Sequence, residues 1–199
     1  MTKIKICGLF RECDVDFVNE AMPDYAGFVF AKSRRQITKE QAYSFRQKLN
    51  SEIMTVGVFV NTKEEEILSL YNDKIISAVQ LHGNENDEYI KNLKRKSGIT
   101  IIKSFNLNAY EEIEKLEKSS ADFLLFDNGS GGTGKTFDWD FVPKIKKPFF
   151  LAGGLNENNI ENAIKLINPY AVDLSTGVES NGLKDKQKIL NVTRRVKNV

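Results

Sequence analysis

The sequence predicts an α/β protein: a (β/α)8 TIM barrel with short loops that forms a single domain over residues 1–199. Two observations support this fold. Eight short apolar segments of strand type alternate with amphipathic segments of helix type, and polar residues or glycines gather where the apolar segments end. An open α/β sheet of six strands is the alternative, and it would require two of the strand assignments to be wrong.

The predicted strands are short apolar runs that lack a strict alternation of apolar and polar residues. Such runs are typical of parallel strands, which are buried on both faces. They span residues 3–7, 25–30, 53–60, 75–81, 99–105, 121–126, 148–153 and 170–175. Eight successive cycles of strand and helix favour a closed barrel over an open doubly wound sheet.

The segments between the predicted strands are rich in charge and amphipathic, as helices that cover a sheet usually are. The clearest span residues 38–49, 62–71, 85–96, 156–166 and 184–196. Thr38 followed by Gln41, and Thr62 followed by Glu65, predict capped helix starts. Cys13 lies in an earlier helical segment, where we expect it to contribute to packing.

Composition narrows the classes of function. A net charge of +2, with lysines and arginines spread along the chain, argues against a nucleic-acid-binding surface. Two cysteines and a single histidine, His82, are too few for a Cys/His zinc site, so we expect neither a metal nor another cofactor. The N-terminal residues lack the apolar core of a signal peptide, and no apolar run is long enough to span a bilayer. We therefore expect a cytoplasmic protein without membrane contact.

The functional residues are expected at one end of the barrel. In this fold the site is built on the loops that follow the carboxyl ends of the strands. The residues that follow the predicted strands are Cys7-Gly8, Lys32–Arg35, Asn61, His82-Gly83, Asp127, Gly153-Gly154 and Ser175–Gly177. The opposite ends of the strands show no such concentration.

Two of these residues have side chains suited to proton transfer. Cys7 should point into the mouth of the barrel, where a nearby cation would make its thiolate accessible as a nucleophile or base. Asp127 follows an apolar strand, and desolvation can raise the pKa of a carboxyl there enough for general acid catalysis. The alternatives are a small buried apolar residue for Cys7 and a turn-forming or helix-capping residue for Asp127.

The loops after the seventh and eighth strands predict an anion site. They contain Gly153, Gly154, Ser175, Thr176 and Gly177. Glycine loops let backbone N–H groups approach an anion, and barrels often bind a substrate phosphate at this pair of loops. A tight turn is the alternative for the two consecutive glycines. Asp173, within the eighth strand, is expected to orient loops or a ligand, and His82 is either a ligand contact or a structural histidine.

Residues 129–136 read G-S-G-G-T-G-K-T and match the phosphate-loop pattern of nucleotide-binding proteins. A functional phosphate loop leads into a long helix, but Pro143 and Pro148 leave room for barely two turns. It also usually follows the first strand of its domain, whereas five strand–helix units precede this one. We interpret the segment as a flexible glycine-rich lid beside the sixth strand.

Together these motifs resemble those of the phosphoribosylanthranilate isomerases, the single-domain barrels of tryptophan biosynthesis. The motifs that carry the resemblance are KICGL (5–9), GFVFAKSRR (27–35), VGVFVN (56–61), VQLHG (79–83), LLFDNGSGGTGKTFDW (124–139), LAGGLNENN (151–159) and VDLSTGVESNGLKD (172–185). They occur in the family's order and extend from the first strand to the last helix. In combination they are far more specific than the glycine loop alone.

The resemblance implies an Amadori rearrangement of N-(5-phosphoribosyl)anthranilate to 1-(2-carboxyphenylamino)-1-deoxyribulose 5-phosphate. It implies that Asp127 is the general acid that opens the furanose ring and that Cys7 is the base that removes the C2′ proton. Arg35 should hold the anthranilate carboxylate. The backbone of the glycine loops should hold the phosphate, through Gly153, Gly154, Ser175, Thr176 and Gly177.

The chain departs from the family pattern at Arg34, where the family usually has proline. By register we expect Arg35, not Arg34, to face the substrate. The alternatives that stay open are another phosphosugar-handling barrel enzyme, a nucleotide-binding module that uses Gly129–Thr136, and an inactive barrel kept as a scaffold. The expected partner is the small-molecule substrate alone, bound by a monomer or a homodimer.

Overall fold

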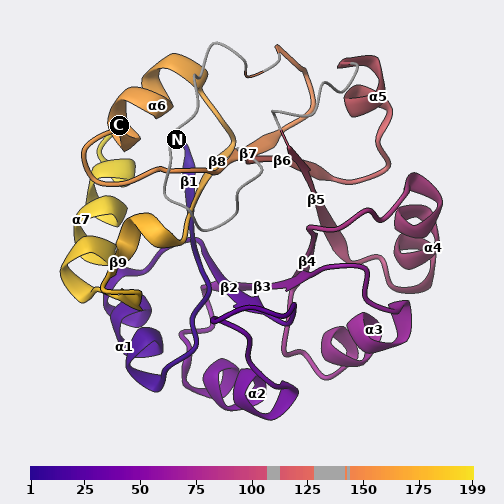
Figure 1. Cartoon of the computed structure of the whole chain (residues 1–199), viewed down its shortest axis with the longest axis horizontal. Coiled ribbons are helices and arrows are strands. Elements are labelled where there is room, and N and C mark those ends of the chain that lie inside the picture. The colour runs from indigo at the N-terminus through magenta and orange to yellow at the C-terminus, as the bar shows by residue number, and fades with distance from the viewer. Residues whose placement is uncertain (107–112, 128–141, 143) are drawn as a thin grey trace.

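The structure is a computed structural model that describes residues 1–106, 113–127, 142 and 144–199. Eight parallel strands pair in chain order and close into a barrel, which confirms the predicted fold (Figure 1). The strands are β1 (Lys3–Cys7), β2 (Tyr25–Val29), β3 (Met54–Phe59), β4 (Ala78–Leu81), β5 (Thr100–Asn106), β6 (Phe123–Asp127), β7 (Phe149–Leu151) and β8 (Ala171–Leu174).

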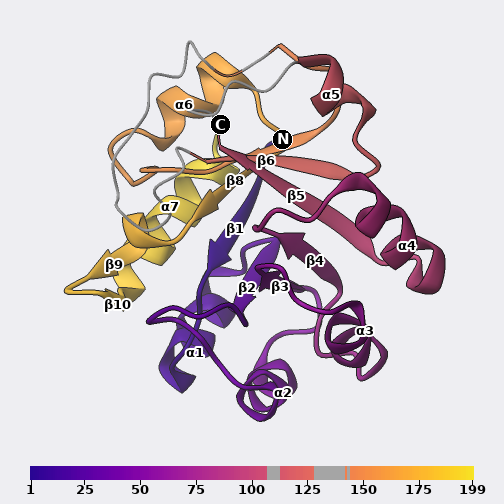
Figure 2. The ribbon, with the colours of Figure 1, turned by 45° about the vertical axis from the view of Figure 1, so that its right-hand side comes forward.

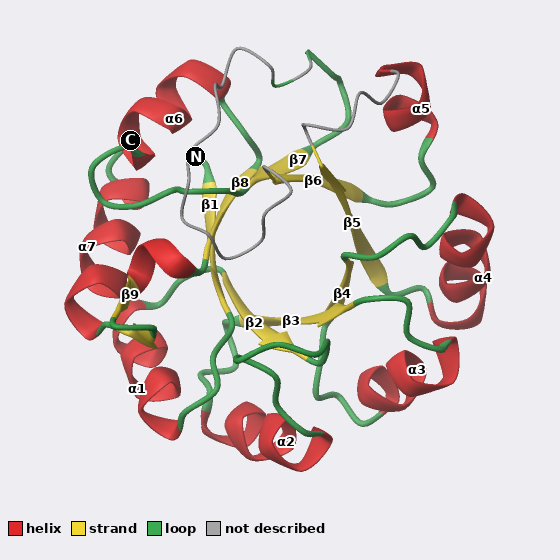
Figure 3. Ribbon diagram, viewed as in Figure 1, coloured by secondary structure: helices red, strands yellow, loops and turns green. Residues whose placement is uncertain are grey.

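Helices form a ring outside the strands (Figure 3). They are α1 (Glu12–Ala21), α2 (Lys39–Lys48), α3 (Glu64–Asn72), α4 (Asp87–Ser97), α5 (Ile113–Lys118), α6 (Ile160–Ile167) and α7 (Lys186–Lys197). A short 3-10 helix, η2 (Thr176–Val178), follows β8. It leads into a small antiparallel hairpin of β9 (Glu179–Ser180) and β10 (Leu183–Lys184), which extends from the barrel beside α7 (Figure 2). Within the described residues, no helix is long and apolar enough to cross a membrane.

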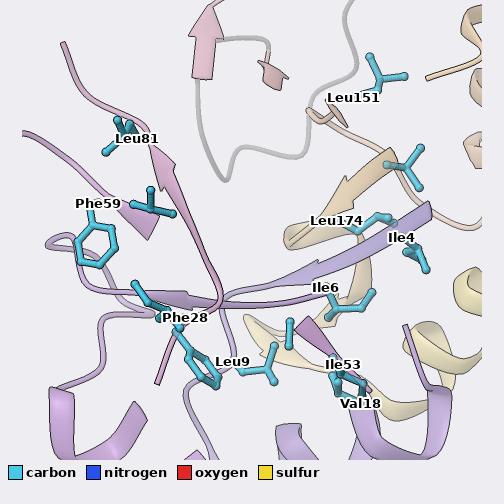
Figure 4. Close-up of a cluster of buried hydrophobic side chains, with 14 of the residues drawn as sticks. Ile4, Ile6, Leu9, Val18, Phe28, Ile53, Phe59, Leu81, Leu151 and Leu174 are labelled. Carbon is cyan, nitrogen blue, oxygen red and sulfur yellow. The ribbon is translucent and has the colours of Figure 1, made fainter. Parts of the chain in front are cut away.

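Along each strand, successive side chains point alternately outward to the helices and inward to the barrel interior. Ile4 and Ile6 of β1 belong to the apolar layer between strands and helices, where Phe28 of β2 also packs (Figure 4). A second apolar cluster fills the interior, and its members are Tyr25, Val56, Ala78, Ile102, Leu125, Phe150, Ala152 and Ala171. The interior is therefore a packed core, as in other barrels of this kind.

Strand register determines which side chains meet inside the barrel. Where β1 pairs with β8 and closes the barrel, Lys5 lies beside Asp173. Where β1 pairs with β2, Cys7 lies beside Gly27. Two charged residues and the candidate base are thus brought to one side of the barrel interior.

The predicted helix starts were correct in one case and wrong in another. Thr38 caps α2: its hydroxyl accepts a hydrogen bond from the Gln41 N–H, and the Gln41 side chain accepts one from the Thr38 N–H. Thr62 does not cap α3, because that helix begins at Glu64 with Lys63 as its N-cap residue. Three consecutive glutamates in the first turn of α3 instead complement the positive end of the helix dipole.

We predict that Thr38→Ala lowers the free energy of unfolding by about 1 kcal/mol, the usual value of an N-cap hydroxyl. Urea denaturation provides the measurement. Thr62→Ala is the matched control and should change the free energy of unfolding by much less, because only the backbone carbonyl of Thr62 has a described hydrogen bond, from the Tyr89 hydroxyl. Equal losses in the two variants would contradict the capping assignment.

Candidate active site

The candidate residues lie on the inner rim at the carboxyl ends of the strands. Cys7 ends β1, Asp127 ends β6, and His82 and Ser175 directly follow β4 and β8. His82, Asp127 and Ser175 are each an even number of residues from a member of the inner apolar cluster on the same strand, so alternation directs their side chains inward. The structure thus brings the expected proton-transfer groups to one rim.

Cys7 is buried next to a charged pair of Asp173, which the sequence singled out, and Lys5, which it did not. The Lys5 ammonium donates to Asp173 Oδ2 at 2.8 Å, and both side chains are almost completely buried. Burial raises the pKa of Cys7 above its usual value, although the nearby charges of Lys5 and Lys184 act to lower it. Desolvation thus outweighs the nearby cations at Cys7, contrary to the simple expectation that a cation lowers the pKa of the thiol.

His82 lies beside Asp127. Its Nε2 is 3.9 Å from Asp127 Oδ2, which is longer than a hydrogen bond. Its Nδ1 lies 2.7 Å from Ser104 Oγ and 3.1 Å from Gln80 Nε2. Burial lowers the pKa of His82, which favours the neutral ring at neutral pH.

Arg35 is held by a buried carboxylate. Its Nε and Nη2 donate to the two carboxylate oxygens of Glu179 at 2.7 and 3.0 Å. The Arg35 side chain passes so close to Gly8 that a Cβ on Gly8 would lie 2.5 Å from Arg35 Cδ. Arg35 therefore lies next to the Cys7 segment.

Arg34 points to the hairpin and not to the rim beside Cys7. It donates to Glu179 Oε2 and, at 2.7 Å, to the Gly182 carbonyl. Its side chain is half exposed, whereas that of Arg35 is largely buried. The residue that replaces the family's usual proline thus ties the loop after β2 to the β9–β10 hairpin.

Glu179 also binds Lys184, which links this cluster to the predicted phosphate loops. The Lys184 ammonium donates to Glu179 Oε1 at 2.8 Å and to the Ser175 carbonyl at 2.9 Å. Hydrogen bonds from Arg35 and Lys184 outweigh the effect of burial and lower the pKa of Glu179 to about 2. Lys5, Glu179 and Lys184 could not be picked out from the sequence, because Lys and Glu side chains are usually solvent-exposed.

The loops after β7 and β8 pack tightly against each other. Gly153 and Gly154 have φ values of +85° and +68°, a conformation that favours glycine. A Cβ on Gly177, in η2 next to Thr176, would lie 1.8 Å from the Leu155 carbonyl oxygen, so only glycine fits there. The five residues expected at the anion site are thus adjacent in space. The phosphate-loop match at residues 129–136 lies outside the described residues.

The sequence profile of the N-(5'phosphoribosyl)anthranilate (PRA) isomerase family matches residues 4–195. The chain belongs to this family. The match extends over all eight strands of the barrel, so it includes both Cys7 and Asp127. Phosphoribosylanthranilate isomerases are enzymes of tryptophan biosynthesis, and this assignment agrees with the resemblance found in the sequence motifs.

Individual relatives agree with the family match over the full length. The N-(5'-phosphoribosyl)anthranilate isomerase of Endomicrobium trichonymphae is 50% identical over 200 residues, which cover 98% of each chain. The structure of the isomerase from Thermus thermophilus has a TM-score of 0.88 at 30% identity and covers 99% of each chain. Another isomerase structure, in complex with reduced 1-(o-carboxyphenylamino)-1-deoxyribulose 5-phosphate, has a TM-score of 0.81 at 32% identity and covers all of both chains.

We predict that Gly27→Ala impairs the isomerase through Cys7. A Cβ on Gly27 would lie 2.8 Å from Cys7 Sγ and 2.9 Å from Cys7 Cα, so the thiol must move. Displacement of a reacting group by about 1 Å costs roughly 100-fold in rate, and we expect such a loss in kcat. Gly57→Ala is the control: its Cβ would meet Phe59 in the apolar layer between strands and helices, so it should reduce stability while kcat is retained. Similar kcat values for Gly27→Ala and wild type would contradict the prediction.

We predict a pH-dependent stability loss for Glu179→Gln. A folded-state pKa of about 2, against an ordinary value of 4.5, corresponds to roughly 3 kcal/mol of stabilisation by the carboxylate. Because the folded pKa is lowered, this stabilisation is fully present above the ordinary value and disappears as the pH falls toward 2. The difference in unfolding free energy between wild type and variant should therefore be largest near neutral pH and narrow below about pH 4.5.

Urea denaturation across this pH range measures the Glu179 effect. Glu12→Gln provides a matched control, because Glu12 forms an exposed ion pair with Lys48. Exposed pairs contribute little, so this control should stay within about 1 kcal/mol of wild type throughout. A difference for Glu179→Gln that did not change with pH would contradict the assignment.

Proposed function

We propose that the chain converts N-(5-phosphoribosyl)anthranilate to 1-(2-carboxyphenylamino)-1-deoxyribulose 5-phosphate by an Amadori rearrangement, with Asp127 as general acid and Cys7 as general base. One observation carries the assignment of roles: both side chains lie on the inner rim at the carboxyl ends of strands, each beside a different polar partner. Family membership supports the reaction itself. The complex of a related isomerase with a reduced form of the product supports the substrate class.

In the first step, Asp127 donates a proton to the ring oxygen of the furanose. The C1′–O bond breaks, and the nitrogen lone pair forms the C1′=N bond of a protonated Schiff base. His82, whose Nε2 faces Asp127, is suited to hold this carboxyl or the released hydroxyl in place. The neutral state of His82 adds no competing positive charge beside the acid.

In the second step, the Cys7 thiolate takes the C2′ proton. The C2′–H electrons form the C1′=C2′ bond of an enolamine, and nitrogen regains its lone pair. Loss of the C2′ hydroxyl proton and protonation of C1′ then give the ketone. The overall change is a transfer of hydrogen from C2′ to C1′, so the reaction neither consumes nor requires a redox group.

Cationic and backbone groups are positioned to bind the two ends of the substrate. Arg35, oriented by Glu179, is the proposed partner of the anthranilate carboxylate. The loop residues Gly153, Gly154, Ser175, Thr176 and Gly177 are the proposed phosphate site. Asp173 is proposed to hold the Lys5 side chain in position. The proposed partner is the small-molecule substrate, bound by a monomer or a homodimer.

We predict that Cys7→Ser and Asp127→Asn each reduce kcat by roughly 100-fold to 10,000-fold, the usual contribution of a general acid or base. The assay generates phosphoribosylanthranilate in situ and follows the loss of its fluorescence. The matched controls are Cys13→Ser, on α1, and Asp122→Asn, at the opposite end of β6; both should keep kcat near the wild-type value. A wild-type rate in Cys7→Ser would show that the proposed base is wrong.

Lys135→Ala, in the phosphate-loop match, separates the proposal from the nucleotide-binding alternative. The isomerase mechanism assigns Lys135 no chemical role. Loss of activity in this variant alone, together with tight binding of ATP by the wild-type chain, would favour the nucleotide-binding module.

A further inference from the structure

We propose that Lys5 is the charge partner of Cys7, and that Asp173 holds Lys5 in position so that the base can carry a negative charge inside the barrel. This inference rests on the proposed role of Cys7 as base. Lys5 would not contact the substrate: it lies one inward-facing position below Cys7 on β1 and is completely buried. It is therefore a positioning residue that acts through the thiol.

Strand register places the Lys5 ammonium beside Asp173 and on the same inward face of β1 as Cys7. It donates to Asp173 Oδ2 at 2.8 Å, across the β1–β8 seam where the two residues are direct neighbours. Cys7 lies two residues further along the same strand, and the charge of Lys5 is the largest of the effects that act to lower the pKa of its thiol. A buried lysine is stable in its charged form only with such partners, and the pKa of Lys5 stays above its usual value despite burial.

Asp173 has a second oxygen without a described partner. Its Oδ1 is buried and accepts no hydrogen bond from the described residues, and its strand, β8, pairs with β1, which carries Cys7. With Cys7 protonated, Lys5 and Asp173 balance each other and the buried group is neutral. When the thiol loses its proton, the group gains one negative charge, and Lys5 is the cation that interacts with it most strongly.

Other charged groups around Cys7 have weaker or opposing effects. The charge of Lys184, on β10, lowers the pKa of Cys7 less than the charge of Lys5 does. The Asp173 carboxylate raises it. Gly27 of β2 contributes no charge at its contact with the thiol. His82 and Asp127 face the rim from β4 and β6, and Arg35 lies over Gly8.

The experiment measures the thiolate of Cys7 directly, independent of catalysis. The wild-type protein and its variants are prepared in a Cys13→Ser background, which leaves Cys7 as the single cysteine. Far-ultraviolet thiolate absorbance is followed against pH, and a Cys7→Ser sample is subtracted. In parallel, the pH profile of kcat/KM is recorded for each variant.

We expect opposite shifts from the two members of the pair. Lys5→Met should move the thiolate titration to higher pH, and each unit of pKa cuts the thiolate fraction at neutral pH about tenfold, with an equal loss of kcat. Asp173→Asn should move the titration to lower pH, because it removes a negative charge and leaves Lys5. Lys5→Arg should stay nearer to wild type than Lys5→Met. A purely structural role for the pair would not produce shifts of opposite sign.

Two controls keep the inference falsifiable if single variants are unstable. The double variant Lys5→Met/Asp173→Asn removes both buried charges, which proteins tolerate better than one uncompensated charge, and should still titrate above wild type. Lys103→Met removes another buried lysine, paired with Glu85 on the loop after β4, and should not move the Cys7 titration. An unchanged titration in Lys5→Met, or a larger upward shift in Lys184→Met, would overturn the proposal. If the wild-type chain had no isomerase activity but the variants still shifted the Cys7 titration as expected, the proposed function would be refuted. The electrostatic pairing of Lys5 with Cys7 would still stand.

Discussion

Closure of the barrel between β1 and β8 is the constraint on which the site depends. The pairing places Lys5 directly opposite Asp173, so the seam between the first and last strands brings a buried cation against a buried anion. Neither charge would be stable alone in the interior, because desolvation of an unpaired ion is far more costly than desolvation of a hydrogen-bonded pair. The strand register that closes the barrel at this seam therefore also places the Lys5 charge beneath Cys7.

A second buried carboxylate organises the outer part of the site. Glu179 accepts hydrogen bonds from Arg34 and Arg35 of the loop after β2 and from Lys184 of the hairpin after β8. Three cations share one anion, so the cluster keeps a net positive charge at the mouth of the barrel. Such a cluster suits a substrate with a carboxylate at one end and a phosphate at the other. The same carboxylate therefore ties the loop after β2 to the hairpin after β8.

The sequence predicted the fold well because the barrel is encoded in local patterns. Short apolar runs followed by glycines and polar residues located the strands and the rim, including Cys7, His82 and Asp127. The pairing partners were not predictable, since Lys5 and Asp173 are 168 positions apart and meet only through strand register. Glu179 escaped notice because nothing local distinguishes a buried glutamate from a solvent-exposed one. The capping assignment at Thr62 failed because two neighbouring residues could each begin the helix, and the first-turn glutamates stabilise it without a capping hydroxyl.

Burial affects the proposed acid, Asp127, and the proposed base, Cys7, in opposite ways. A dry interior favours neutral forms, which suits a carboxyl that must donate a proton and opposes a thiol that must lose one. In this chain the two residues have different neighbours. Asp127 lies beside a neutral imidazole, whereas Cys7 lies beside the Lys5 ammonium, with β7 and β8 between their strands in the sheet. Burial still dominates and raises the pKa of Cys7, so the proposed base depends on the fixed positive charge of Lys5 to carry its thiolate.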